Sequence, residues 1–484
     1  MLQVSPHFPI LIVDPAKGER KKVKIRSPFD EHLIATVTMA TQTDIEQALT
    51  TATETFANRR EWLSVAKRIE ILEKAVQLMT KRADSLAQGS AEEGGKPLID
   101  SVVEMTRCID SIRLCAETLR HQVAHPVPMG INAASQQKMT MHSKEPIGVV
   151  VAVSAFNHPL NLIAHQVGPA IAAGCPVIVK PAEDTPLSCF RLVELLYEAG
   201  LPAAWCQAVL PESHEISEAL VTDPRVAFFS FIGSAKVGWY LRSKLAPGTR
   251  CALEHGGVAP VIVTETADHE KLIPALAKGG FYHAGQVCVS VQRVFVAESM
   301  LTDIAEKLAH MAQQLVVGDP LSGQTEVGPL IREAEVERVA QWVEEAIDEG
   351  ATLLCGGKAL SHHCYAPTVL LNPSSKSKVS RAEVFGPVVC LYGYQTIEQA
   401  ITEANALEVA FQAAVYSQDI DQAMSIADKL AASTVMINEH TAFRVDWMPF
   451  AGLRQSGLGT GGIPYTIEDM QVDKMVVLAS AGLS

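Results

Sequence analysis

The sequence predicts an α/β protein built on parallel sheets, and three observations support this fold class. From residue 147 onward, short β-branched runs alternate with helical segments of roughly ten to fifteen residues, the pattern of βαβ units. The chain has 484 residues, enough for two or three domains of roughly 100–200 residues each. Charged residues make up 19% of the chain and apolar residues 48%, which is typical of a soluble globular protein.

Two helical segments are expected before the alternation begins. Residues 59–88 read as helical because apolar residues such as Trp62, Val65 and Ile69 recur at three- and four-residue spacing. Residues 101–121 are expected to form another helix.

The alternating region is expected to form two sets of strands and helices. The first set has strands at 147–153, 176–179, 206–210 and 226–231, and helices at 160–173 and 185–199. A second set starts at Val261 and runs to about residue 440, and residues 473–478 read as a final strand.

Composition argues against several classes of protein. The net charge of −14 disfavours nucleic-acid binding, which needs clustered Lys and Arg. The ten cysteines form no Cys-x-x-Cys pair and no zinc-ligand spacing, so we expect reduced thiols, a cytoplasmic protein and no bound metal. We find no signal peptide and no apolar run of about eighteen residues that could span a membrane.

Cys288 and Glu254 are the two residues most informative about function. A thiolate is a strong nucleophile and a carboxylate can accept a proton from water, so the pair could form a thioester and then hydrolyse it. Taken alone, a cysteine is more often a small buried apolar residue, and a Glu before Gly-Gly is more often part of a turn.

Several motifs in order along the chain favour the catalytic interpretation. They are Leu253-Glu-His-Gly-Gly257, Gly285-Gln-Val-Cys288, Lys180-Pro-Ala-Glu183, Phe231-Ile-Gly-Ser234, Glu383-Val-Phe-Gly-Pro387, Pro449-Phe-Ala-Gly452 and Ser456-Gly457. Together they resemble the aldehyde dehydrogenase superfamily, of the NAD(P)-dependent, non-acylating type. The resemblance covers nearly the whole chain and implies Cys288 as nucleophile and Glu254 as base.

The resemblance also implies an architecture of two Rossmann-like, parallel-sheet domains and a small β bridging element. It assigns 1–124 and 146–254 to an NAD-binding domain and 255–449 to a catalytic domain. Residues 125–145 and 465–484 are assigned to the bridging element, which pairs strand edges between subunits in the family. A homodimer or homotetramer is therefore expected.

The cofactor site lacks the usual dinucleotide fingerprint Gly-x-Gly-x-x-Gly. A helix N-terminus at Gly233 and Ser234 could instead bind the pyrophosphate through free N–H groups. Lys180 and Glu183 follow the strand at 176–179 and are expected to contact the cofactor, at the edge of the sheet where such folds bind ligands. Glu183 could bind a ribose diol and would repel a 2′-phosphate, which predicts NAD rather than NADP.

The remaining cofactor contacts are implied by the resemblance alone. They are Ser154, Phe156, Glu383 and Phe385.

The implied reaction is oxidation of an aldehyde to its acid. Asn157 and the backbone N–H of Cys288 would stabilise the oxyanion, and Glu254 would activate water to release the acid. The carboxylate of Glu254 favours hydrolysis over transfer to coenzyme A. Two alternatives stay open, a coenzyme A-acylating dehydrogenase and a non-catalytic protein that retains the fold. His255 and His283 also permit a Cys–His dyad, which explains the motifs less well.

Two arginines are candidates for substrate recognition. By resemblance, Arg107 and Arg444 border the substrate tunnel. Guanidinium groups bind carboxylate, phosphonate or sulfonate through paired hydrogen bonds, which predicts an aldehyde with an acidic far end, such as a semialdehyde. The competing interpretation is structural ion pairing, with Asp446 as a partner of Arg444.

Overall fold

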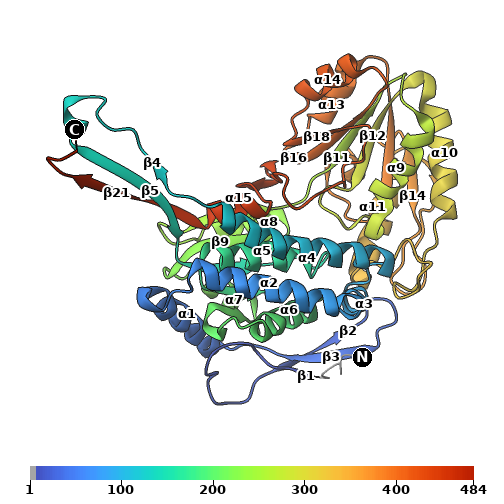
Figure 1. The fold of residues 1–484 in the computed structure, drawn as a ribbon. Coiled ribbons are helices and arrows are strands. Elements are labelled where there is room, and N and C mark those ends of the chain that lie inside the picture. The colour runs from blue at the N-terminus through green and yellow to red at the C-terminus, as the bar shows by residue number, and fades with distance from the viewer. Residues whose placement is uncertain (1–6, 484) are drawn as a thin grey trace.

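The computed structural model describes residues 7–483 and contains two large sheets, each covered by helices, and a projecting β arm (Figure 1). One sheet has six strands, five of them within residues 149–254, and the other has seven strands, all within residues 259–437. The predicted α/β class with parallel, Rossmann-like sheets is confirmed.

The six-stranded sheet has the order β20-β10-β9-β6-β7-β8. Its strands are β6 (Val149–Val153), β7 (Val177–Lys180), β8 (Cys206–Ala208), β9 (Val226–Ile232), β10 (Arg250–Glu254) and β20 (Gly457–Leu458). All neighbours pair in parallel except β20, which runs antiparallel to β10. Both faces are buried, because Val150 and Ala152 enter one hydrophobic cluster while Val149 and Val151 enter another. This burial on both faces explains why the strand reads as a continuous apolar run.

Helices cover both faces of this sheet. They are α1 (Gln42–Ala57), α2 (Val65–Lys81), α3 (Ala83–Gly94), α4 (Leu98–His121), α5 (Asn161–Ala173), α6 (Pro186–Glu198), α7 (His214–Thr222), α8 (Ala235–Arg242) and α15 (Ile463–Asp469). A small sheet of β1 (His7–Phe8), β2 (Lys22–Arg26) and β3 (Leu33–Thr38) was not expected from the sequence.

The range predicted as helical at 59–88 contains two α-helices, α2 and α3, that meet at Arg82. Arg82 leaves helical geometry there and forms a two-point ion pair with Glu198 at the end of α6, at 2.7 and 2.8 Å. A hydrophobic period cannot locate such a break, because both helices present apolar residues to the same core.

The seven-stranded sheet has the order β13-β14-β15-β12-β11-β17-β18. Its strands are β11 (Ala259–Val263), β12 (Val291–Ala297), β13 (Thr352–Cys355), β14 (Thr368–Leu371), β15 (Val388–Tyr394), β17 (Gln412–Tyr416) and β18 (Thr434–Ile437). Only β13 is antiparallel to its neighbour. The associated helices are α9 (His269–Phe281), α10 (Leu301–Gln314), α11 (Glu333–Asp348), α12 (Lys378–Arg381), α13 (Ile397–Ala404) and α14 (Ile420–Lys429).

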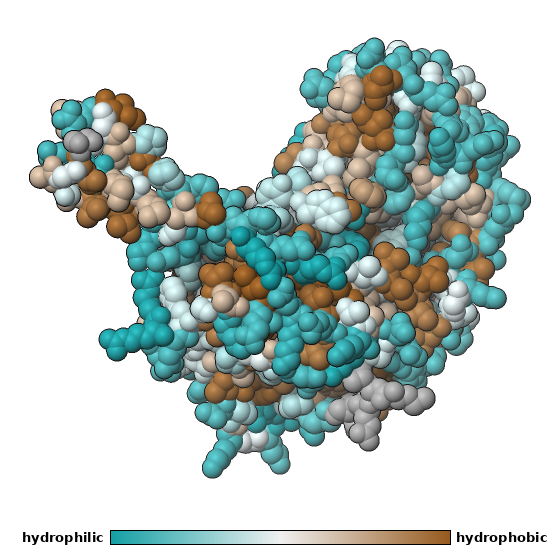
Figure 2. Space-filling view, in the orientation of Figure 1, coloured by the Kyte–Doolittle hydropathy of each residue, from teal (hydrophilic) through white to brown (hydrophobic). Residues whose placement is uncertain are grey.

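The arm is a three-stranded sheet of β4 (His125–Pro126), β5 (Lys138–Pro146) and β21 (Gln471–Ala479). It projects from the body and carries apolar side chains on its surface (Figures 1 and 2). The exposed ones include Met139, Met141, Met475, Val476, Val477 and Leu478. Residues 463–469 form α15, which packs on the body rather than in the arm. The predicted domain boundaries stay a prediction.

The chain also contains short elements. They are β16 (Val409–Ala410), β19 (Leu453–Arg454), η1 (Arg59–Glu61), η2 (Ala133–Ser135), η3 (Ala203–Trp205), η4 (Tyr282–Gly285) and η5 (Glu298–Met300). Within residues 7–483, no helix combines the length and apolar character needed to cross a membrane.

Candidate active site

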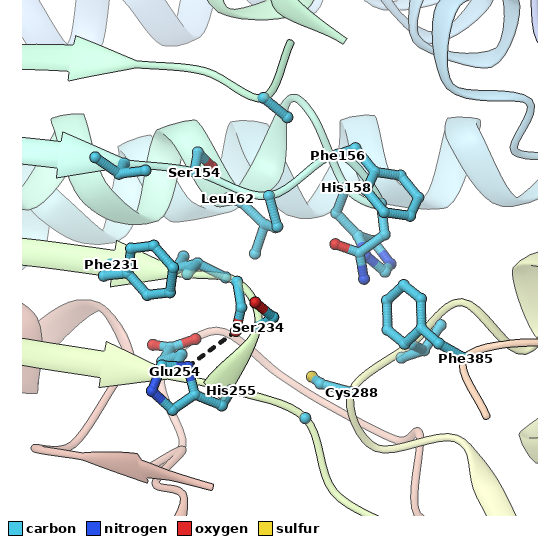
Figure 3. Close-up of a pocket in the computed structure, with 18 of the residues that line it drawn as sticks. Ser154, Phe156, His158, Leu162, Phe231, Ser234, Glu254, His255, Cys288 and Phe385 are labelled. Atoms are coloured by element: carbon cyan, nitrogen blue, oxygen red, sulfur yellow. Dashed lines mark hydrogen bonds between the residues drawn. The ribbon is translucent and has the colours of Figure 1, made fainter. Parts of the chain in front are cut away.

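A cavity of about 1070 Å³ lies where the carboxyl ends of β6, β7, β9 and β10 meet the loop before β12. Figure 3 shows Cys288 and Glu254 reaching this cavity from separate segments of the chain. Every residue predicted for the site lines it: Arg107, Ser154, Phe156, Asn157, Lys180, Glu183, Gly233, Ser234, Glu254, Cys288, Glu383, Phe385 and Arg444. The fold therefore brings together the motifs that are scattered along the sequence.

The loop that carries Cys288 is held in an unusual backbone conformation. Just upstream, His283, Ala284 and Gly285 all have positive φ, at 48°, 53° and 70°. A side chain at Gly285 would begin 2.1 Å from the carbonyl oxygen of Gly386, so glycine is required by both conformation and space. Histidine is one of the residues that tolerates this left-handed region better than most. Such local strain is concentrated at functional sites.

The Cys288 thiol is partly exposed and lies in a mixed electrostatic environment. Burial raises the pKa of Cys288 to about 12, the nearby Arg444 guanidinium opposes this rise, and Glu383 and Glu254 add to it. Neither His255 nor His283 hydrogen-bonds Cys288 within residues 7–483, and His255 instead donates from Nδ1 to the carbonyl of Gly233 at 2.9 Å (Figure 3).

Glu254 is the last residue of β10 and its carboxylate lies against Gly461, where a Cβ would be 2.3 Å from Oε1. Burial raises the pKa of Glu254, and Arg444 partly offsets that effect. A carboxylate with a raised pKa is a better proton acceptor than an exposed one. The position thus suits a general base.

The turn after Glu254 packs against Glu383. A Cβ on Gly256 would lie 1.8 Å from Oε1 of the Glu383 carboxylate. This close approach explains why position 256, the first of the Gly-Gly pair, is a glycine. Burial raises the pKa of Glu383 to about 8, and Arg338 lowers it in part. Glu383 Oε1 has no hydrogen-bond partner among the described residues, so it is free to accept one from a ligand.

Asn157 follows β6 and donates from Nδ2 to the carbonyl oxygen of Gln286 at 2.9 Å. The Gln286 side chain is itself fixed, because it accepts from the Ile331 N–H at 3.0 Å and donates to the Pro329 carbonyl at 3.2 Å. An amide nitrogen carries two N–H groups, so one bond to Gln286 leaves the second available. Asn157 is thereby oriented beside the segment that carries Cys288.

The N-terminus of α8 fits the phosphate part of a dinucleotide. Ser234 is the N-cap residue of this helix, and no side chain satisfies its first N–H groups. Free N–H groups at a helix start bind anions. Ser154 Oγ is also buried and unpartnered among residues 7–483. Across the cavity, Lys180 Nζ and Glu183 Oε1 lie 3.5 Å apart at the end of β7.

The two predicted arginines have different surroundings. Arg107 forms a two-point ion pair with Asp446, with Nε–Oδ2 at 3.1 Å and Nη2–Oδ1 at 2.7 Å. Arg444 stacks over the Phe450 ring at 3.5 Å and donates to His165 Nδ1 at 3.4 Å. Within residues 7–483, Arg444 forms no ion pair and its Nε has no partner. Asp446 is therefore the partner of Arg107 and not of Arg444.

Sequence reasoning missed the network around Asp446. This carboxylate also accepts from His165 Nε2 at 2.7 Å and from Asn161 Nδ2 at 3.2 Å. Burial opposes its ionisation, but His165 and Arg107 outweigh burial and hold the pKa of Asp446 well below its usual range. No sequence signal identifies these partners, because they are far apart in the chain. Among the described residues, no three His, Cys, Asp or Glu side chains are grouped to hold a metal ion.

This fold and site define a cysteine-dependent class of oxidoreductases, and comparison with known proteins agrees. The model of the aldehyde dehydrogenase family matches residues 15–476, and the chain belongs to this family. It is 37% identical over 458 residues to a 3-sulfolactaldehyde dehydrogenase from Priestia aryabhattai, covering 95% of each chain. The protein is an NAD(P)-dependent aldehyde dehydrogenase.

Solved structures support the same conclusion. An aldehyde dehydrogenase from Physcomitrella patens, in complex with the reaction product succinate, has a TM-score of 0.94 and 33% identity, covering 98% of this chain and 99% of its own. A glyceraldehyde-3-phosphate dehydrogenase from Methanocaldococcus jannaschii complexed with NADP has a TM-score of 0.90 and 32% identity, covering 96% and 100%. An NAD-dependent aldehyde dehydrogenase from Sinorhizobium meliloti has a TM-score of 0.93 and 29% identity, covering 99% and 96%.

Proposed function

We propose that this enzyme oxidises a small aldehyde with an anionic far end to the corresponding carboxylic acid, with NAD as cofactor. The substrate class is inferred from Arg444. This cation lines the cavity and forms no ion pair with an acidic residue within 7–483. Glu254 and Asp446 act on Arg444 from beyond ion-pair distance, so its guanidinium keeps hydrogen-bonding capacity for an anion. A carboxylate, phosphonate or sulfonate on the substrate would form paired hydrogen bonds with it.

The comparisons support the same class of substrate. The name of the Priestia aryabhattai relative specifies an aldehyde with a sulfonate group, and the Physcomitrella patens enzyme was solved with the dicarboxylate succinate. Both molecules carry an acidic group away from the carbon that reacts.

Cys288 would act as the nucleophile. The Cys288 sulfur would add to the aldehyde carbon as the thiolate, with its proton released to solvent. The negative charge that develops on the aldehyde oxygen is stabilised by the second N–H of the Asn157 side chain and by the backbone N–H of Cys288. The bond from Asn157 to Gln286 supports this role, because it fixes the amide before substrate arrives.

Hydride removal from the aldehyde carbon is the chemistry that a nicotinamide dinucleotide, held by Ser234, Glu383 and Phe385, would supply when bound, and a thioester on Cys288 would remain. Glu254 then takes a proton from water, and the resulting hydroxide attacks the thioester carbon. The C–S bond breaks, the acid leaves, and the sulfur is restored. Because Glu254 lines the same cavity as Cys288, hydrolysis is favoured over transfer to coenzyme A.

The cofactor is proposed to be NAD. Ser234 and Gly233 at the start of α8 would hold the pyrophosphate, with Ser154, Phe156, Glu383 and Phe385 completing the site. Glu183, half-exposed beside Lys180, can accept hydrogen bonds from a ribose diol and repels a 2′-phosphate. The ratio of kcat/KM for NAD and NADP tests this choice, and a preference for NADP would defeat it.

The substrate class can be tested with a matched pair of aldehydes. Succinic semialdehyde and butanal have four carbons each and differ in the far carboxylate. Replacing Arg444→Met should lower kcat/KM for the semialdehyde about 10- to 100-fold more than kcat/KM for butanal, the value of a charge-assisted hydrogen bond. Butanal should lose only the effect of Arg444 on Cys288 and Glu254. NADH absorbance measures both rates.

Arg107→Met is the comparison variant, because its guanidinium is already held by Asp446. It should affect both aldehydes by the same factor. Equal losses on the two aldehydes in Arg444→Met would rule out Arg444 as the anion site. Turnover that requires added coenzyme A would instead support the acylating alternative.

We also propose that the enzyme is a homodimer or homotetramer assembled through the arm. The exposed apolar residues of β5 and β21 support this, since a surface of this kind on a thin sheet is usually covered by a partner. A cytoplasmic location stays a prediction, which the ten free cysteines support. Light scattering of the purified protein gives the number of subunits.

A further inference from the structure

Two glutamates that lie outside the cavity cap the helices that follow β6 and β7. Glu104 Oε1 accepts from the backbone N–H groups of Leu160 and Asn161 at the start of α5, both at 2.9 Å. Glu93 accepts from Leu187 and Ser188 at the start of α6, at 2.8 and 2.7 Å. The two carboxylates thus make the same contact at two neighbouring helices.

Both carboxylates are fully enclosed by protein. Glu93 is 0% exposed and Glu104 is 1% exposed. The N-cap residues of α5 and α6, Leu160 and Thr185, provide no side-chain cap of their own. The first N–H groups of a helix lack partners within the helix and favour a negative charge. Glu104 and Glu93 accept these N–H groups from α4 and α3, so they fix where each of these two helices begins. Burial raises the pKa of Glu93 to about 7, against the opposing effect of Arg191 and the hydrogen bonds from α6.

Each capped helix start closes a loop that carries proposed site residues. The loop between β6 and α5 contains Ser154, Phe156 and Asn157, and the loop between β7 and α6 contains Glu183. A carboxylate that fixes the helix start therefore fixes the end of the loop. Glu104 acts on the loop of the proposed oxyanion donor, and Glu93 acts on the loop of the proposed ribose ligand.

Lys96 connects Glu104 to the main chain of Asn157. Its ammonium group is 0% exposed, donates to the Glu104 carboxylate and lies 3.5 Å from the backbone carbonyl oxygen of Asn157. Ser90 Oγ also donates to Glu104, at 3.3 Å. One buried ion pair thus joins α4, the start of α5 and the main chain of Asn157.

The start of α8 provides the contrast. This helix follows β9, has no side-chain cap, and faces the cavity at Ser234. Four helices follow parallel strands at this edge of the sheet. Glu104 and Glu93 cap α5 and α6, Ser213 caps α7 with its own side chain, and the start of α8 has no side-chain cap that would compete with a phosphate.

We propose that Glu104 and Glu93 are positioning residues, that Lys96 assists Glu104, and that the two glutamates act on different steps. This inference rests on the proposed roles of Asn157 and Glu183. Glu104 sets the oxyanion donor against Cys288 and controls the chemical step. Glu93 sets the ribose loop and controls cofactor affinity.

The two variants Glu104→Gln and Glu93→Gln control for each other, because each removes one buried carboxylate that caps one helix. Glu104→Gln should lower kcat about 10- to 100-fold, as expected when a catalytic group is misplaced by about an ångström. It should raise KM for NAD by a smaller factor, because the same loop carries Ser154 and Phe156. Glu93→Gln should raise KM for NAD about tenfold and leave kcat within about threefold. Steady-state rates with NAD and quenching of tryptophan fluorescence by NAD measure the two effects.

A third variant covers the case in which Glu104→Gln does not fold, since that change leaves Lys96 without its counter-charge. The double variant Lys96→Met/Glu104→Gln removes both charges and should recover the melting temperature while kcat stays low. If kcat and KM for NAD changed in the same ratio in Glu104→Gln as in Glu93→Gln, both glutamates would be merely structural, and the proposal would be overturned. Wild-type kcat in a folded Glu104→Gln enzyme would also overturn it. The proposed function fails separately, if Cys288→Ala keeps full turnover.

Discussion

Arg107 and Asp446 are 339 residues apart in the chain and form a two-point ion pair at 3.1 and 2.7 Å. Arg107 lies on α4, and Asp446 lies in the long loop after β18 that also carries Arg444. His165 of α5 also binds this loop, because it donates to Asp446 and accepts from Arg444. The pair therefore holds the substrate loop against the helices of the six-stranded sheet and keeps Arg444 facing the cavity.

Replacing Asp446→Asn should reduce the free energy of unfolding by about 3 kcal/mol at pH 7, because Arg107 loses its counter-charge in a poorly solvated place. Urea denaturation followed by circular dichroism measures the change. Asp428→Asn, an exposed aspartate on α14, is the matched control and should change stability by less than about 0.5 kcal/mol. A loss no greater than in this control would show that the ion pair does not stabilise the loop.

The pH dependence of Cys288 alkylation should reflect its raised pKa. Burial raises the pKa of this thiol to about 12, against the opposing effect of Arg444. Since the thiolate is the reactive form, the rate with iodoacetamide should rise about tenfold per pH unit from pH 7 to 10 without a plateau. Peptide mass spectrometry follows the label on Cys288, and Cys288→Ser gives the background from the other cysteines. A plateau below pH 9 in the absence of ligands would contradict this prediction.

Gly285→Ala should abolish activity and destabilise the protein. The residue has φ of 70°, and an added Cβ would lie 2.1 Å from the Gly386 carbonyl oxygen. Gly130→Ala separates the two effects, because Gly130 has a similar φ of 80° with nothing within 4 Å of the added carbon. The control should lose only about 1–2 kcal/mol for the left-handed backbone. Similar stability and activity in the two variants would show that the contact with Gly386 relaxes at no cost.

Glu254→Gln should separate the two halves of the reaction. If Glu254 is needed mainly to activate water, the variant should release up to one equivalent of NADH per site in a rapid phase and then turn over at least about 100-fold more slowly than wild type. Stopped-flow absorbance at the NADH band resolves the two phases. Asn157→Ala is the comparison, since loss of an oxyanion donor should slow the rapid phase itself. No rapid phase in Glu254→Gln would assign Glu254 to an earlier step.

The sequence alone predicted the fold class and the residues that meet in the cavity. Strands and helices follow from hydrophobic patterns within short segments, so the sequence predicted elements such as β6 and α5 directly. Cys288, Glu254 and Asn157 lie in ordered motifs whose residue types match their chemistry, and the cavity contains all three.

What only the tertiary structure decided is which groups pair. Asp446 forms its ion pair with Arg107, and Arg444 forms no ion pair within residues 7–483, although Asp446 is close to Arg444 in sequence. Glu93 and Glu104 occur in helical sequence, where a charged residue usually faces water, and yet each is buried against the start of another helix. The physical reason is that a charge is stabilised by whatever the fold brings within about 3 Å, and contacts across hundreds of residues leave no local pattern in the sequence.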